Sequence, residues 1–233
     1  MSYKNEELEE NNSFRFKQIF KILKPREPVN AFTHLLGAAV SVPALALLIK
    51  NIPDKSIIRY YAGLYTFGIS LFLLYITSGF YHLISASNKI IAVMRRMDHV
   101  MIYILIAGTY TPLCLLALTG AWRWGLLSTV WILALAGIVF KIFWFKAPRW
   151  VSTGSYIIMG WIAVSALYPL AMSISLFSMF CLVLGGLLYT MGAVVYAIQK
   201  PRINLKHFGF HEIFHMFVLA GSTTHYLMVY QLL

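Results

Sequence analysis

The stretch FGFHEIFHMFVLAGSTTHYLMVYQLL, residues 208–233, decides how the rest of the chain is interpreted. It is an apolar run long enough to cross a bilayer as a helix, since a crossing of ~30 Å takes roughly 20 residues. Near its start lie His211, Glu212 and His215. Two histidines four residues apart project from a helix in directions about 40° apart, so both can ligate one ion. Because ionisable groups inside a membrane segment are costly, these residues mark a candidate metal site.

The composition places the chain in a membrane. Of 233 residues, 60% are hydrophobic and 12% are charged, and the mean hydropathy is +0.73. A soluble domain is about half apolar and about a quarter charged. The net charge of +11 does not indicate a nucleic-acid partner, because the basic residues are scattered over short links. Cys114 and Cys181 lie in separate apolar runs, which indicates neither a disulfide framework nor a thiolate metal site. Membrane lipids are the expected partners.

Residues 1–28 are predicted to form a cytoplasmic N-terminal tail, followed by a membrane domain over residues 29–233. The tail has an acidic patch at 6–10 and then a basic stretch over 15–26. Residues 14–23 can form an interfacial helix on anionic headgroups. Alternatively, the whole tail is solvated and partly disordered.

Seven apolar segments of roughly membrane-crossing length follow, joined by short links. They are residues 30–49, 57–83, 98–118, 124–145, 153–172, 175–198 and 210–232. Short links make neighbouring helices antiparallel, so we predict an all-α bundle of seven transmembrane helices. Pro43, Pro112 and Pro169 fall inside segments, where we expect kinks and freed backbone carbonyls.

The charges in the links predict the orientation of this bundle. Of the 19 Lys and Arg residues, only Lys50, Lys55, Arg59 and Arg123 fall on the side that carries the links after the first, third and fifth segments. The positive-inside rule therefore places the N-terminus in the cytoplasm and the C-terminus outside, and we expect a multi-pass protein of the plasma membrane. G-protein-coupled receptors have the opposite orientation, so seven spans alone do not indicate that class.

Polar residues gather at the cytoplasmic ends of three segments. Ser78 and His82 close the second segment, Asp98 opens the third, and His211 and His215 open the seventh. The charge-based orientation, which did not use these five residues, places all of them in one leaflet. Ser78 and His82 are four residues apart and share a face of their helix.

Three neutral imidazoles with one open coordination position suit a catalytic Zn²⁺ site. We predict that His82, His211 and His215 hold Zn²⁺, which lowers the pKa of a bound water to about 7 and polarises a carbonyl. Asp98 would orient that water and act as general base or acid, and Ser78 would hold the water or a substrate oxygen. Two simpler interpretations stay open. Asp98 can pair with a neighbouring arginine, and Ser78 can merely pack between helices.

The other histidines are expected to lie outside this site. His225 is about 15 Å further along its helix than His215, which is too deep to join the same ion. His34 can line the cavity, although packing is the favoured interpretation. His99 follows Asp98 and is expected to face elsewhere.

At these residues the sequence resembles the hemolysin III family, which is related to the adiponectin and progestin receptors and more distantly to the alkaline ceramidases. The motifs are EPVNAFTHLLGA, SGFYHL, MDHVMIYILIAGTYTP and HEIFHMFVLAGSTTHY, in this order along the chain. The resemblance implies a seven-helix membrane fold with Zn²⁺ near the cytoplasmic side. Carried over residue by residue, the family's metal ligands fall on His82, His211 and His215, its water-holding aspartate on Asp98 and its serine on Ser78. The long N-terminal region of the animal receptors is missing, so hormone sensing is not implied.

Four functions fit these observations. The first is a zinc-dependent hydrolase of amide or ester bonds in a lipid-like substrate, and the second is a pore or channel that permeabilises membranes. The third is a non-catalytic regulator or receptor with structural zinc. The fourth is a protease of the HExxH type with Glu212 as its base. The protease is disfavoured, because its third metal ligand is unassigned.

Overall fold

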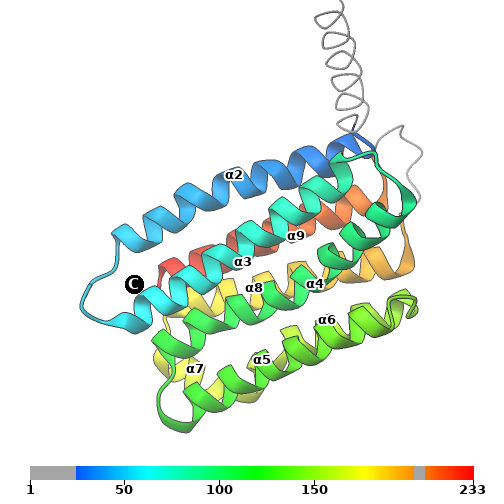
Figure 1. Ribbon diagram of the computed structural model, residues 1–233. Coiled ribbons are helices and arrows are strands. Elements are labelled where there is room, and N and C mark those ends of the chain that lie inside the picture. Colours follow the sequence, from blue (N-terminus) through cyan, green and yellow to red (C-terminus); the bar gives the residue numbers. More distant parts are fainter. Residues whose placement is uncertain (1–24, 202–207) are drawn as a thin grey trace, which may run out of the picture.

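The computed structural model describes residues 25–201 and 208–233, and in these ranges the chain is a bundle of packed helices (Figure 1). The longer helices are α2 (Pro28–Lys50), α3 (Ile58–Leu83), α4 (Asn88–Pro112), α5 (Gly120–Phe143), α8 (Leu176–Ile198) and α9 (Phe210–Tyr230). The shorter ones are α6 (Arg149–Gly160) and α7 (Leu167–Ser173), with a π-helical turn at Leu113–Ala117 and a 3₁₀ turn at Ile162–Ala166. The expected all-α fold is confirmed, whereas the predicted interfacial helix at 14–23 lies outside the described residues.

Six stretches of the described chain are helical, long and apolar enough to cross a membrane. They are Pro28–Lys50, Ile58–Leu83, Asn88–Ala117, Gly120–Phe143, Arg149–Ser173 and Leu176–Ile198. Helix α9 does not join them, because its histidines, Glu212 and hydroxyl residues lower its hydropathy. It nevertheless packs against α8 and α2 and runs along the bundle beside the other helices (Figure 1).

Helix α4 begins at Asn88, well before the start expected near residue 98. Arg95 and Arg96, which were expected in a link, therefore belong to a helix. Lys141, also counted with a link, lies in the last turn of α5 and is buried. These basic side chains consequently have fixed positions relative to Asp98 and the rest of the bundle.

The fifth crossing, Arg149–Ser173, is not one continuous α-helix. It changes to a 3₁₀ turn at Ile162 and resumes as α7 at Leu167. The Tyr110 hydroxyl of α4 stabilises the break, since it donates to the Gly160 carbonyl (2.7 Å) and accepts from the Ala163 amide (2.8 Å). Inside a membrane such freed backbone groups must find a partner within the protein.

The three prolines differ in their effects. Pro112 ends α4 where the chain passes into the π-helical turn, and Pro169 lies just after the 3₁₀ turn. By contrast, α2 continues as an α-helix through Pro43. A proline removes one helical hydrogen bond, and neighbouring helices decide whether the helix then changes type.

Helices α2 and α3 approach closely at Gly79, next to Ser78. A Cβ atom at Gly79 would lie 2.7 Å from the Leu35 side chain and 3.1 Å from the Leu35 backbone nitrogen. The missing side chain therefore sets the distance between these helices.

We predict that Gly79→Ala lowers the melting temperature in detergent, because overpacking a tight helix contact costs about 1–3 kcal/mol. Gly125→Ala is the matched control. A Cβ at this exposed α5 glycine meets no atom within 4 Å. The control should be neutral or stabilising, since alanine favours helix by about 1 kcal/mol. Equal melting temperatures for both variants would contradict the close approach.

Candidate metal centre

Three histidines meet where the end of α3 faces the start of α9. His82 lies in the last turn of α3, and His211 and His215 lie on successive turns of α9. One nitrogen from each ring can be chosen so that all three lie within 4.8 Å of one another. The Nε2 atoms of His82 and His211 are 3.4 Å apart. His82 and His215 are almost fully buried, with exposed fractions of 1% and 2%.

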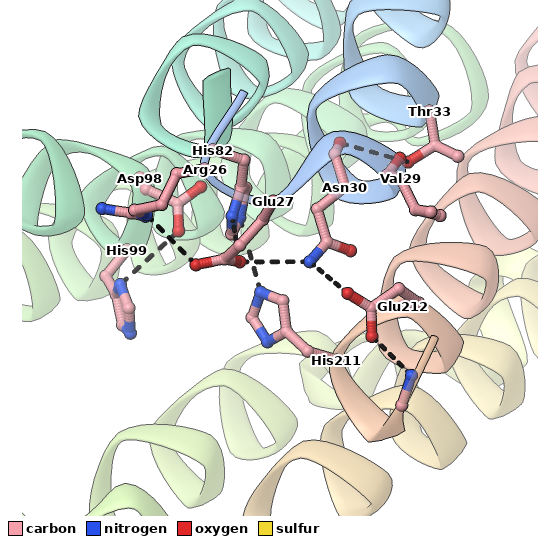
Figure 2. Close-up of polar contacts among 11 residues, drawn as sticks. Arg26, Glu27, Val29, Asn30, Thr33, His82, Asp98, His99, His211 and Glu212 are labelled. Carbon is pink, nitrogen blue, oxygen red and sulfur yellow. Dashed lines mark hydrogen bonds and ion pairs between the residues drawn. The ribbon is translucent and has the colours of Figure 1, made fainter. Parts of the chain in front are cut away.

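A carboxylate orients the first of these rings. Glu27, at the start of α2, accepts a hydrogen bond from His82 Nδ1 at 2.7 Å (Figure 2). With the proton on Nδ1, the lone pair of Nε2 faces the other two histidines. Burial raises the pKa of Glu27, but hydrogen bonds from His82 and Asn30 and the charge of Arg26 outweigh it and hold this pKa below its usual value. Glu27 is therefore an ionised partner of the kind that metal-ligating histidines usually have.

A chain of hydrogen bonds extends from Glu27 to α9. The Asn30 amide donates to Glu27 Oε2 at 3.2 Å and to Glu212 Oε1 at 2.7 Å (Figure 2). The other Glu212 oxygen, Oε2, accepts from the Gly209 amide at 2.7 Å and caps α9. Both Glu212 oxygens are thus engaged, one with Asn30 of α2 and the other with the N-cap of α9. This arrangement argues against Glu212 as the free general base of an HExxH site.

Asp98 and Ser78 line the same cavity as His211 and His215. Asp98 Oδ2 lies 3.7 Å from His99 Nδ1, whereas its expected alternative partners, Arg95 and Arg96, form no ion pair with it in the described chain. Ser78 is buried one helical turn before His82. A carboxylate and a hydroxyl therefore face the space next to the histidines.

Two further histidines line this cavity. His34 of α2 stacks on His215, with ring centroids 3.7 Å apart and planes 14° apart, so it both packs and borders the cavity. Neither His34 nitrogen has a hydrogen-bond partner among the described residues. His99 also borders the cavity, against the expectation that it faces elsewhere. Its Nδ1 donates to the Arg95 carbonyl at 2.8 Å, and its Nε2 lies 3.2 Å from the Tyr196 hydroxyl oxygen.

The cavity continues from the histidines into the apolar middle of the bundle. It has a volume of about 130 Å³ and reaches the level of Trp161 and His225. Its walls between the two ends are largely aliphatic and aromatic, including Leu74, Ile102, Leu105, Ile106 and Val218. His225 lies at the deep end, where Nε2 donates to the Leu182 carbonyl at 3.3 Å, and does not belong to the histidine cluster. The cavity would therefore accommodate one ligand with its polar head near the histidines and its apolar body in the middle of the bundle.

The three histidines fit a metal ion. His215 Nδ1 is buried without a hydrogen-bond partner in the described chain, and Nε2 of His82 faces Nε2 of His211. Neutral imidazole nitrogens suit zinc and other late first-row metals. Three protein ligands would leave a four-coordinate ion one position for water or a substrate.

Sequence reasoning missed Glu27 and Asn30, although both lie in the motif EPVNAFTH. The available signal was a carboxylate and an amide three residues apart at the start of an apolar segment. Charge-based orientation places that start in the same leaflet as the histidines.

We predict that Glu27→Gln weakens metal binding about 10- to 100-fold, the usual effect of removing a carboxylate behind a ligating histidine. Competition with a coloured chelator measures the affinity of the purified protein for Zn²⁺ and Co²⁺. Asp54→Asn is the control for loss of a carboxylate, because Asp54 is exposed and bonds only to Ser56 in the described chain. Unchanged affinity in Glu27→Gln would contradict this role.

Comparison with known proteins places the chain in a family. The sequence model of the family described as "Haemolysin-III related" matches residues 22–226. "Hemolysin-3" of Bacillus cereus is 39% identical over 203 residues, 87% of this chain and 90% of that protein. The "Hemolysin-3 homolog" of Bacillus subtilis (strain 168) is 40% identical over 87% of this chain and 92% of its own length. "Monocyte to macrophage differentiation factor" of Homo sapiens is 24% identical over 88% of this chain and 83% of its own. The chain is therefore a membrane protein that belongs to the haemolysin-III-related family.

Proposed function

We propose that this protein is a zinc-dependent hydrolase that cleaves an amide or ester bond in a lipid-like substrate. His82, His211 and His215 would hold the zinc. One observation carries the proposal: nitrogens of three histidines lie within 4.8 Å of one another, and two of these histidines, His211 and His215, line a cavity that a carboxylate and a hydroxyl also line. A site that only tied helices together would have no need of that cavity.

Zinc on three histidines activates water and polarises a carbonyl group at its open position. Asp98 is the residue placed to accept a proton from the attacking water and later to donate it to the leaving group. Nδ1 of its neighbour His99 lies 3.7 Å from the carboxylate. Ser78, buried beside the cavity, would donate a hydrogen bond to a substrate oxygen.

The apolar part of the cavity supports a substrate with a hydrocarbon chain. A chain lying along Leu105 and Val218 would bring its carbonyl end toward the histidines. Burial of apolar surface gives about 25 cal/mol per Å², so such a chain supplies most of the binding free energy. The polar groups at one end then determine the orientation.

The proposal includes the membrane topology. Helix α9 would be the seventh crossing, with its polar residues facing the bundle, where ionisable groups in membranes are found. The N-terminus would lie in the cytoplasm and the C-terminus outside, in the plasma membrane. The positive-inside rule supports this orientation, because Lys89, Arg95, Arg96 and Lys141 lie near the same end of the bundle as the histidines.

We predict that chelation of zinc abolishes hydrolysis of long-chain N-acyl and O-acyl fluorogenic lipids, and that added Zn²⁺ restores it. Asp98→Asn should lower kcat about 10²- to 10⁴-fold, the range of general acid–base catalysis. Glu212→Gln is the comparison variant that tests the protease alternative; Asn30 and Gly209 both donate to Glu212, and the one oxygen of glutamine can still accept from one of them. Hydrolysis that continues after chelation would refute the scheme. So would a loss of turnover in Glu212→Gln together with normal turnover in Asp98→Asn.

The names of the Bacillus relatives favour a second candidate, membrane permeabilisation. Release of a dye from liposomes distinguishes the two functions. A pore should release dye in the wild type and in His211→Ala alike, because leakage through a conduit does not need the metal. The hydrolase proposal expects no release from liposomes that lack a cleavable lipid.

A further inference from the structure

Three basic side chains surround one aromatic ring at the end of the bundle that carries the histidines. The guanidinium carbons of Arg95 and Arg96 lie 4.8 and 5.1 Å from the ring centroid of Phe145, and Lys141 Nζ lies 5.5 Å from it. Arg95 and Arg96 come from α4, Lys141 from α5, and Phe145 from the connection between α5 and α6. We refer to these four residues as the basic cluster.

The basic cluster has no carboxylate partner in the described chain. The ion pairs there involve Glu27 and Asp98, and none of them includes a cation of the cluster. Lys141 is only 3% exposed, and its ammonium group donates to Ser152 Oγ at 2.7 Å. A buried charge without a counter-charge is strongly unfavourable, and neighbouring like charges repel. Arg95 and Arg96 are exposed, so the burial cost falls on Lys141. The Phe145 ring offsets only part of that cost, and an anion bound by the two arginines would offset the rest.

The cluster lies next to a residue that lines the cavity, His99. Arg95 precedes Asp98 and His99 by three and four residues, so the three share a face of α4. The His99 ring, which lines the cavity, lies edge-to-face with Phe145 at 6.1 Å. An anion held by the cluster would therefore sit beside the polar end of the cavity.

The depth of the cluster indicates a lipid rather than a soluble anion. Trp144 and Trp150 flank Phe145 along the connection and are 53% and 72% exposed. Exposed tryptophans at the ends of transmembrane helices lie at the level of the lipid headgroups. The basic cluster is thus expected at the depth where the phosphates of membrane lipids lie.

We propose that Arg95, Arg96 and Lys141 form a binding site for the phosphate group of an anionic phospholipid. Arginine donates paired hydrogen bonds that match the geometry of phosphate oxygens, and Lys141 adds a buried positive charge. The site does not depend on catalysis, because the lipid that it holds need not be the lipid that is cleaved. A bound phosphate would neutralise the cluster and fix the start of α4 against the connection between α5 and α6.

The test is the affinity of the purified full-length protein for phosphatidylglycerol, measured by native mass spectrometry in neutral detergent. The variant Arg95→Gln/Arg96→Gln should bind this lipid at least about tenfold more weakly, because charge-assisted hydrogen bonds are lost. The control Lys89→Gln/Lys146→Gln removes the same charge from exposed positions at the same end of the bundle and should stay within about threefold. Arg95→Lys/Arg96→Lys, which keeps the charge but not the paired hydrogen bonds, should have an affinity between those of the wild type and the glutamine variant.

Phosphatidylcholine and inorganic phosphate serve as competing probes. We expect phosphatidylcholine to bind more weakly than phosphatidylglycerol, and inorganic phosphate to displace it only at large excess. If Arg95→Gln/Arg96→Gln and Lys89→Gln/Lys146→Gln lose equal affinity for phosphatidylglycerol, the lipid is attracted to the basic surface in general. That result would overturn the site. Inorganic phosphate that binds as tightly as the lipid would overturn the assignment to a phospholipid. Neither outcome bears on the hydrolase proposal, which the chelation assay tests separately.

Discussion

The structure depends on the convergence of three imidazole rings inside an apolar bundle. Nitrogen lone pairs that face one another repel unless a cation or a proton lies between them, and in a low-dielectric interior that repulsion is strong. Nevertheless His82 Nε2 and His211 Nε2 are 3.4 Å apart, and His215 Nδ1 is buried without a partner in the described chain. A shared cation resolves this arrangement most simply. Helices α3 and α9 each pack against α2, which brings the end of α3 and the start of α9 together at these rings.

A frame of hydrogen bonds formed by Glu27, Asn30 and Glu212 joins the helix ends that carry the rings. Glu27 bonds to His82, Asn30 bridges Glu27 and Glu212, and Glu212 caps the helix that carries His211 (Figure 2). Residues far apart in the sequence are thereby joined at the ends of α2, α3 and α9. Such partners determine which nitrogen of a histidine carries the proton, and they orient the ring before any ligand arrives. The frame makes the site a property of the folded bundle rather than of one helix.

Much of the architecture followed from hydropathy, spacing and charge. Hydrophobic periodicity predicted the apolar segments, and helical spacing paired His211 with His215. The distribution of charged links predicted that Ser78 and Asp98 share one leaflet. A single sequence contains all of this information. The role of Glu27 did not follow, because no local rule states which ring a carboxylate at a helix start will contact. The break in the α-helix at Trp161 could not be predicted from the sequence either, since it depends on the Tyr110 hydroxyl of another helix. The start of α4 was placed too late because Arg95 and Arg96 made a helical turn look like a link.

The histidines, the polar part of the cavity and the basic cluster lie at the same end of the bundle. The most direct test of this account is X-ray absorption spectroscopy at the metal edge of the purified protein. The account predicts one zinc ion per chain with three nitrogen scatterers and one oxygen scatterer at about 2.0–2.2 Å. It also predicts loss of that signal in His82→Ala and His215→Ala but not in His225→Ala. A protein that binds no metal, a sulfur-rich coordination shell, or a signal unchanged without His82 would contradict it.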